Sequence, residues 1–193
     1  TVDSLISGAY PSVSMYEIGI YGEEEYLNFA DEATAEASDS EIASFSGENT
    51  NDNDLETRWA SNYEHGDKTL TYTFEEAKEL KSMILRWERC NAKAFQIQVD
   101  DNGEWKTVYT GTQPTSFVQK INLTESYTTT KVRLVINDFF DDSPLEDGSP
   151  MNYPTVSLYE VQMYDRELVI EPEDVVTVDD IAANITSAEL SED

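Results

Sequence analysis

Short runs in which apolar and polar residues alternate recur along the middle of the chain. The segment 68–74 reads Lys-Thr-Leu-Thr-Tyr-Thr-Phe, and the same period of two places Met83, Leu85 and Trp87 on one face of a later segment. Successive side chains of a strand point to opposite faces, so this period predicts half-buried strands. Further strand-like runs lie at 26–29, 34–38, 95–99 and 132–136.

Turn signals separate these runs. Asp100-Asp-Asn-Gly103 joins the run at 95–99 to the segment 105–109, and an Asn-Gly pair between alternating runs is typical of a tight hairpin. No sustained 3.6-residue apolar period supports a helix here, even in the Ala- and Glu-containing segment 34–38. Short strands with frequent turns predict an all-β sandwich or barrel.

Two twelve-residue segments of the chain resemble each other. Tyr10–Tyr21 and Tyr153–Tyr164 are identical at seven of twelve positions and lie 143 residues apart. This offset is longer than a solenoid repeat and matches the length of one domain. We therefore expect a tandem array of similar modules, and we expect the segment 10–21 to pair with another strand. The alternative is a chance likeness of two β-rich segments.

The repeat suggests how the chain is divided. Residues 1–25 would be the last strand of a preceding similar module, and residues 26–166 would form one β-sandwich. The segment 167–193 is acidic and contains Glu171-Pro-Glu-Asp, so we expect a linker or the start of a further module there.

The charge of the chain limits its partners. It has 40 Asp and Glu against 12 Lys and Arg, a net charge of −28. Nucleic acids and anionic lipids are bound through Lys and Arg, so we expect neither partner, whereas divalent cations and neutral ligands fit an acidic chain. One Cys and one His are too few for an internal disulfide or the common zinc clusters. The sequence contains no apolar run of about 18 residues, the length that would predict a membrane-spanning helix.

The stretch Asn49–Trp59 is the most polar candidate for a site. It contains two Asp, three Asn and two Thr, and it ends in Trp59, which we assign to the core. Asn and Asp favour turns, so the stretch reads as a compact loop whose oxygens converge. Calcium takes about 6–8 such oxygens. A solvated acidic turn is the alternative.

The order of these motifs resembles a known family. Asp52–Trp59 is similar to the Asp-Gly-Asn/Asp-x-x-Thr-Arg-Trp signature of discoidin domains, also called coagulation factor five/eight type C domains. Their bacterial branch is carbohydrate-binding module family thirty-two. The later strands of the family are similar, in the same order, to the segments 84–88, 95–99, 101–105 and 156–161 of this chain. The resemblance implies a jelly-roll β-sandwich of the galactose-binding-domain-like type, usually non-catalytic, with a structural calcium.

The resemblance also implies a set of calcium ligands. They are the Asn49 carbonyl and the side chains of Asp52, Asp54, Thr57 and Glu160. Asn53 stands where the family usually has Gly, so the loop would have to turn through Asn, which tolerates the left-handed conformation. Two further observations support Glu160 as a ligand. A carboxylate in an otherwise apolar strand needs a partner, and Glu17 occupies the equivalent position in the repeat. An Arg58–Glu160 or similar ion pair is the alternative.

Sugar sites in the resembled family lie in loops at one end of the sandwich. Exposed aromatic rings stack on sugars there, and polar side chains bond the hydroxyls. In this chain the candidates are Tyr63, His65, Arg89, Asn91, Phe139 and Phe140. Arg89 follows a strand end where galactose-binding members often place an Arg. Each candidate also has a structural explanation: one of Phe139 and Phe140 is expected in the core, and His65 suits a solvated loop.

Together these observations favour a non-catalytic carbohydrate-binding module of a larger secreted or cell-surface bacterial glycan-active protein, such as an accessory module of a glycoside hydrolase. The expected partners are a glycan, with galactose-type sugars as one candidate, and adjacent modules of the same chain, at an extracellular location. The alternative is an adhesion or spacer module that binds protein or has no ligand. An enzyme is not expected, since a serine or cysteine triad would depend on the single His65.

Overall fold

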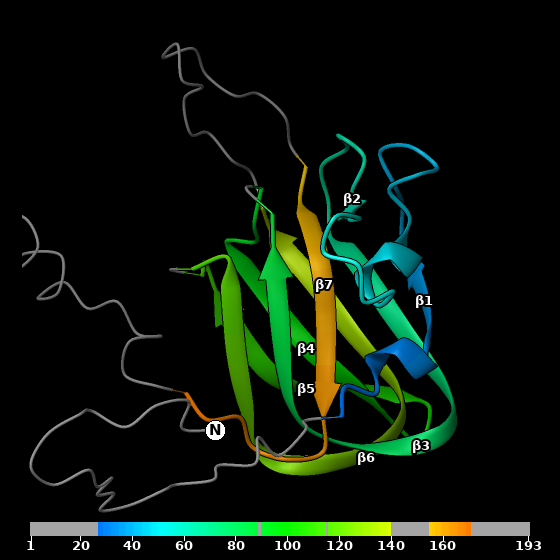
Figure 1. Cartoon of the computed structure of the whole chain (residues 1–193), viewed down its shortest axis with the longest axis vertical. Coiled ribbons are helices and arrows are strands. Elements are labelled where there is room, and N and C mark those ends of the chain that lie inside the picture. Colours follow the sequence, from blue (N-terminus) through cyan, green and yellow to red (C-terminus); the bar gives the residue numbers. More distant parts are fainter. Residues whose placement is uncertain (1–26, 89, 115, 140–154, 171–193) are drawn as a thin grey trace, which may run out of the picture.

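The computed structural model describes residues 27–88, 90–114, 116–139 and 155–170 (Figure 1). These residues form an antiparallel β-sandwich with two short 3-10 helices. In chain order the elements are η1 (Ala30–Glu32), β1 (Thr34–Ala37), η2 (Gly47–Thr50), β2 (Trp59–Ala60), β3 (Lys68–Trp87), β4 (Ala94–Asp101), β5 (Glu104–Thr112), β6 (Val118–Asp138) and β7 (Ser157–Tyr164). Both helices are single turns, and neither could span a bilayer.

Two long bent strands build the two layers of the sandwich. One layer has the order β1-β3-β6-β4-β5 and uses Lys68–Thr73 of β3 with Lys131–Ile136 of β6. The other has the order β2-β7-β3-β6 and uses Ser82–Trp87 of β3 with Val118–Asn122 of β6. Both strands curve through the base of the molecule in Figure 1. The predicted all-β sandwich is therefore confirmed.

The length of β3 corrects one expectation. The alternating runs at 68–74 and 83–87 were expected to be separate strands, and they are the two ends of one strand of 20 residues. Register shifts against β6 between Thr73 and Lys78 and between Leu80 and Ser82 bend the strand between its ends. At this bend Glu75, Glu76, Ala77 and Glu79 are exposed, so the alternating pattern is interrupted although the strand continues.

The hairpin between β4 and β5 agrees with the sequence. Asn102 and Gly103 take positive φ values of 57° and 93°, the conformation that an Asn-Gly turn provides at low cost. The Gly103 amide donates to Asp100 Oδ1 at 2.8 Å. The return strand runs from Glu104 to Thr112, longer than the expected 105–109.

The core fills the space between the layers. Trp59 is completely buried, as predicted, and Trp87 and Phe95 are 1% exposed, with their ring centroids 5.6 Å apart. Burial of large apolar side chains from both layers stabilises the sandwich. The segment 34–38, expected to be the opening strand, forms β1 over Thr34–Ala37. Before it, Phe29 packs into the core just ahead of η1, and its amide donates to the Met163 carbonyl of β7 at 3.1 Å.

The expected strand at 10–21 and the tail from residue 171 onward lie outside the described residues. The division into a preceding strand, one module and a linker therefore stays a prediction.

Candidate functional site

The polar stretch 49–59 folds into a compact loop beside β7. Thr57 Oγ1 lies 2.8 Å from Asp52 Oδ2 and 3.0 Å from the Asp54 carbonyl oxygen, so three oxygens from three residues meet. The Asp54 amide donates to Asp52 Oδ1 at 2.9 Å. Asn53 has a φ of 60°, which confirms that the turn passes through an Asn in the left-handed conformation.

Glu160 lies beneath this loop without a hydrogen-bonding partner. Its side chain is 1% exposed, and neither carboxylate oxygen has a hydrogen bond. Burial, followed by the nearby Asp52 carboxylate, raises the pKa of Glu160 to about 8, although the Asn53 amide and Arg86 act in the opposite direction. A buried group of this kind is costly unless a proton or a cation compensates it.

A cation of the calcium type fits this donor set. Two carboxylates, a hydroxyl and a carbonyl are hard oxygen donors, and the two orphaned oxygens of Glu160 could bind in the bidentate mode. The part of the chain that the structure describes holds no group of three or more His, Cys, Asp or Glu positioned for a metal. The fit therefore depends on neutral oxygens together with Asp52 and Glu160.

Two of the predicted ligands take roles that the sequence did not predict. The Asn49 side-chain amide donates to the carbonyls of Ser44 and Arg58 at 2.8 Å each, which fixes the start of the loop. Asp54 Oδ1 accepts the Glu56 amide at 2.9 Å, so the Asp54 carbonyl, rather than its carboxylate, meets Thr57. Ligation by either residue stays a prediction.

The alternative ion pair between Arg58 and Glu160 is not formed. The Arg58 guanidinium lies over the Phe45 ring, 4.2 Å from its centroid, and its Nε is buried without a hydrogen bond. Glu160 has no hydrogen-bonding partner. Arg86 is the cation opposite Glu160 in the register of β3 and β7, and its Nε donates to Gln162 Oε1 at 3.3 Å.

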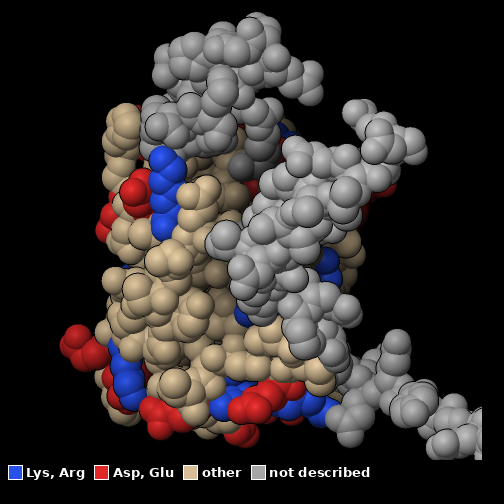
Figure 2. Space-filling model, turned by 90° about the vertical axis from the view of Figure 1, so that its left-hand side faces the viewer, with Lys and Arg blue, Asp and Glu red and all other residues tan. Residues whose placement is uncertain are grey.

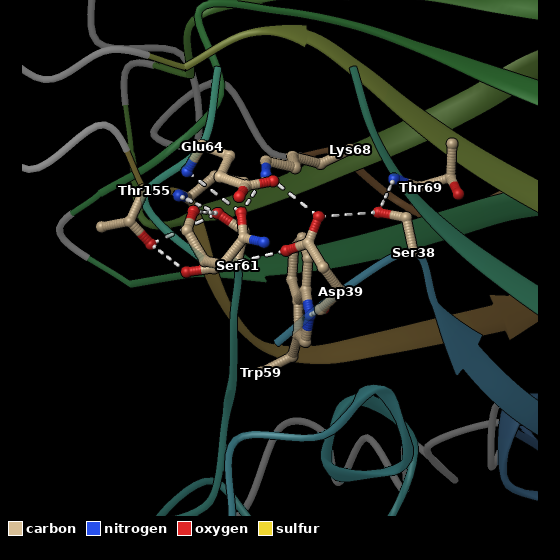
Figure 3. A network of polar contacts seen from close by, with 10 residues as sticks. Ser38, Asp39, Trp59, Ser61, Glu64, Lys68, Thr69 and Thr155 are labelled. Carbon is tan, nitrogen blue, oxygen red and sulfur yellow. Dashed lines mark hydrogen bonds and ion pairs between the residues drawn. The ribbon is translucent and has the colours of Figure 1, made fainter. Parts of the chain in front are cut away.

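A buried polar network supports the loops beyond β1 and β2 (Figure 3). Lys68 Nζ lies 3.0 Å from Asp39 Oδ2 and 2.5 Å from Asn62 Oδ1, and the lysine side chain is 3% exposed. Asp39 also accepts the Asn62 amide at 2.8 Å, and its carbonyl accepts Trp59 Nε1 at 2.8 Å. One lysine thus ties the loop after β1 to the loop after β2.

The same end of the sandwich is fastened to β7 by hydroxyl groups. Thr155 Oγ1 donates to the Ser61 carbonyl at 2.8 Å, and the Val156 amide donates to Ser61 Oγ at 3.1 Å. Ser157 Oγ donates to the Trp59 carbonyl at 3.0 Å. The segment 59–62 is therefore held from both sides, and the side chains that follow it project from a fixed base.

Tyr63 is the exposed aromatic ring on this base. It is 47% exposed, and its hydroxyl donates to Glu41 Oε1 at 2.5 Å. The Glu41 amide in turn donates to the Ala60 carbonyl at 2.8 Å. Glu41 was not predicted, because it is 22 residues from Tyr63 and no local pattern links them. The result is an oriented ring with a carboxylate at its edge.

The other predicted sugar-binding residues are placed differently. His65 is exposed in the same loop as Tyr63. Asn91 is half-buried and follows Cys90 in the chain. The Cys90 carbonyl accepts the amide of Ser157 in β7, and β7 also pairs with β2, which precedes Tyr63. β7 therefore lies between Asn91 and the segment that carries Tyr63. Arg89 and Phe140 lie outside the described residues. The structure therefore places Tyr63 and His65 in one exposed loop and leaves Asn91 apart.

Phe139 does not fit a stacking role. It is 5% exposed and belongs to the main core, with Lys68 Nζ 5.8 Å from its ring centroid. Stacking on a sugar needs an open ring face. This corrects its inclusion among the sugar-binding candidates and agrees with the expectation that one of the two phenylalanines is a core residue.

A jelly-roll sandwich with an oxygen-rich loop against β7 defines a discoidin-type module. The model of the F5/8 type C domain family matches residues 32–146, more than half of the chain, and the chain belongs to this family. The comparison with curated proteins gave no match.

Solved structures similar to this chain include carbohydrate-binding modules. Chitosan-binding module 1 of a chitosanase/glucanase from Paenibacillus sp. IK-5 is 29% identical, with a TM-score of 0.60 over 72% of this chain and 99% of that one. Chitosan-binding module 2 of the same enzyme, in complex with chitotriose, is 25% identical, with a TM-score of 0.60 over 71% and 99%. The family 32 module of C. perfringens NanJ, in complex with galactose, is 15% identical, with a TM-score of 0.58 over 72% and 98%, which shows a common fold alone.

Proposed function

We propose that this chain is a non-catalytic carbohydrate-binding module that binds a glucosamine-type glycan through the loop end bearing Tyr63 and Glu41. The observation that carries the proposal is the exposed Tyr63 ring with its hydroxyl held by the Glu41 carboxylate. A ring of this kind stacks on the apolar face of a sugar, and a carboxylate at its edge accepts hydrogen bonds from hydroxyl or ammonium groups.

The choice of a glucosamine-type glycan rests on similarity and on charge. The solved modules that are 25–29% identical to this chain are described as chitosan-binding, whereas the galactose-bound module is 15% identical. Chitosan carries ammonium groups, and the chain has a net charge of −28, so attraction to a cationic polymer would raise the association rate. A galactose-type sugar, the candidate from the sequence, is therefore the less favoured ligand.

The proposal includes a calcium ion with a structural role. Asp52, Thr57, the Asp54 carbonyl and Glu160 would hold it, and it would supply a partner for the two Glu160 oxygens, which have no hydrogen bond. We also propose that the module is part of a larger extracellular or cell-surface glycan-active protein with adjacent similar modules. Weak binding by one module would then be strengthened by its neighbours through avidity.

Titration calorimetry with defined oligosaccharides tests the glycan proposal. Wild-type protein in millimolar calcium should bind fully deacetylated glucosamine oligomers, and less tightly their N-acetylated counterparts and galactose. Tyr63→Ala should abolish binding with an unchanged melting temperature, and Tyr63→Phe should retain the ring and lose part of the affinity. If the folded wild type binds none of these sugars, the proposal is wrong and the adhesion or spacer role becomes the better explanation.

A further inference from the structure

A hollow lies on the outer face of the sandwich, between the loop 51–57 and the start of β6. Its volume is about 390 Å³, within the range of roughly 300–1,000 Å³ that small-molecule sites occupy. It is lined by Leu55, Arg86, Trp87, Glu88, Phe117, Val118 and Tyr159. We call it the Phe117 groove.

The walls of the Phe117 groove are apolar and open to solvent. Phe117 is 60% exposed, Leu55 55% and Val118 38%. Apolar side chains that gather around one hollow on an acidic protein mark an interaction site more strongly than isolated ones do. Where the described surface is visible in Figure 2, uncharged side chains form a continuous area on the left of the view, and red and blue side chains gather above and below it.

Backbone contacts hold these walls in place. The Trp87 amide donates to the Phe117 carbonyl at 2.7 Å, and Val118 is paired with Arg86 in the register of β3 and β6. On the other side, Leu55 lies inside the turn closed by the Glu56 amide and Asp54 Oδ1 at 2.9 Å. The groove is therefore formed before a ligand arrives, which lowers the entropy that binding has to offset.

Glu88 connects the Phe117 groove to the Tyr63 end of the module. The Glu88 amide donates to the Ser157 carbonyl, Ser157 is paired with Ala60, and the Ala60 carbonyl accepts the Glu41 amide. Hydrogen-bonded neighbouring backbones lie about 4.8 Å apart, so these three steps separate the backbones of Glu41 and Glu88 by about 14 Å. A separation of this size is one that an oligomer spans and a single sugar ring does not.

The chemistry of the groove suits an amino sugar. The Phe117 ring offers an apolar face for the C–H groups of a sugar. One Glu88 carboxylate oxygen accepts the Cys90 amide at 3.2 Å, and the carboxylate keeps further lone pairs for an ammonium group. Arg86, the cation of the groove, donates through Nε to Gln162 and faces the buried Glu160.

We propose that the Phe117 groove is a second subsite, which binds a further residue of a glucosamine polymer whose chain also contacts Tyr63 and Glu41. The proposal rests on the proposed function and adds a length preference to it. Oligomers that reach both Tyr63 and the groove bind more tightly than the disaccharide, and Glu88 favours a free ammonium over an acetamide.

Calorimetry with fully deacetylated glucosamine oligomers of increasing length, from the dimer upward, tests this subsite on the full chain. Wild-type affinity should rise with length. Phe117→Ala should remove most of that rise, a loss of roughly three- to tenfold for the long oligomers, as expected for one ring contact. Val169→Ala is the matched control, because Val169 is an apolar side chain, 62% exposed, that does not line the groove.

Glu88→Gln tests the preference for the ammonium group. It should weaken binding of the long deacetylated oligomers and leave that of partly N-acetylated ones less affected. Melting curves of each variant, recorded in parallel, show that the fold is intact.

The outcomes separate the two proposals. If Tyr63→Ala abolishes binding and Phe117→Ala matches the wild type at every length, the groove is not a subsite and the proposed function stands. A wild-type affinity that does not change with length would overturn the subsite as well. If the wild type binds no oligomer, both proposals fall.

Discussion

Lys68, which is buried, and Asp39, which is half-buried, form an ion pair beneath the loops that present Tyr63 and Glu41. Lys68 Nζ lies 3.0 Å from Asp39 Oδ2, with the two side chains 3% and 21% exposed. The pair is completed by Asn62, which accepts from Lys68 and donates to Asp39. An ion pair of this kind contributes less to net stability than to geometry, because its desolvation offsets most of its attraction.

Removing one member of this pair should destabilise the protein strongly. Asp39→Ala leaves the Lys68 ammonium buried without its carboxylate, so we expect the free energy of unfolding to fall by about 3 kcal/mol. Urea denaturation measures this change. The control is Glu32→Ala, which breaks the exposed Lys78–Glu32 pair and should cost less than about 1 kcal/mol. Equal losses in the two variants would contradict the role given to Lys68.

Calcium should raise the stability of the wild type. A ligand that binds only the native state stabilises it by about 2.7 kcal/mol at a hundredfold excess over Kd, so EDTA should lower the melting temperature and added calcium restore it. Glu160→Gln should lose most of this calcium-dependent shift. A melting temperature that is the same in EDTA and in calcium would remove the metal proposal.

Without a metal, stability should depend on pH through Glu160. Its pKa is about 8 in the folded chain, against about 4.3 for glutamate in an unfolded chain. Between these values the folded state holds a proton that the unfolded state has released, so stability falls as pH rises, by about 1.4 kcal/mol per pH unit.

The difference between wild type and Glu160→Gln in EDTA isolates this effect. The other acidic groups contribute similarly to both proteins, so the difference in the free energy of unfolding should change steadily between about pH 5 and pH 8. Denaturant titrations at several pH values measure it. A difference that stays constant over this range would show that Glu160 is not a buried, perturbed carboxyl.

Phe139 and Tyr63 should respond in opposite ways to truncation. Phe139→Ala removes a buried ring from the core, so we expect a loss of about 3–5 kcal/mol in the free energy of unfolding. Tyr63→Ala removes a ring that is 47% exposed, so stability should change by less than about 1 kcal/mol. Thermal melts and calorimetry on both variants check the assignment, which would be reversed if Phe139→Ala folded normally and lost the ligand.

The sequence alone determined the fold class and the loop beside β7. Alternation of apolar and polar residues is a local property that strands impose on any half-buried sheet, so β4 and the hairpin after it could be predicted. The polar stretch ending in Trp59 and the acidic residue in an apolar strand were also visible locally. Both observations pointed to the same loop, because a carboxylate in an apolar strand needs a partner and the polar stretch offers oxygens for a shared cation.

Only the tertiary structure decided which residues meet. The bend in β3 depends on pairing with both ends of β6, which are distant in sequence, and the contact of Glu41 with Tyr63 arises because Glu41 bonds to Ala60. Phe139 looked like a loop aromatic and is a core residue, since its burial is set by side chains from other strands. The Phe117 groove likewise exists only where three strands and the loop 51–57 come together. Local pattern determines the elements, and long-range packing determines the surfaces that bind.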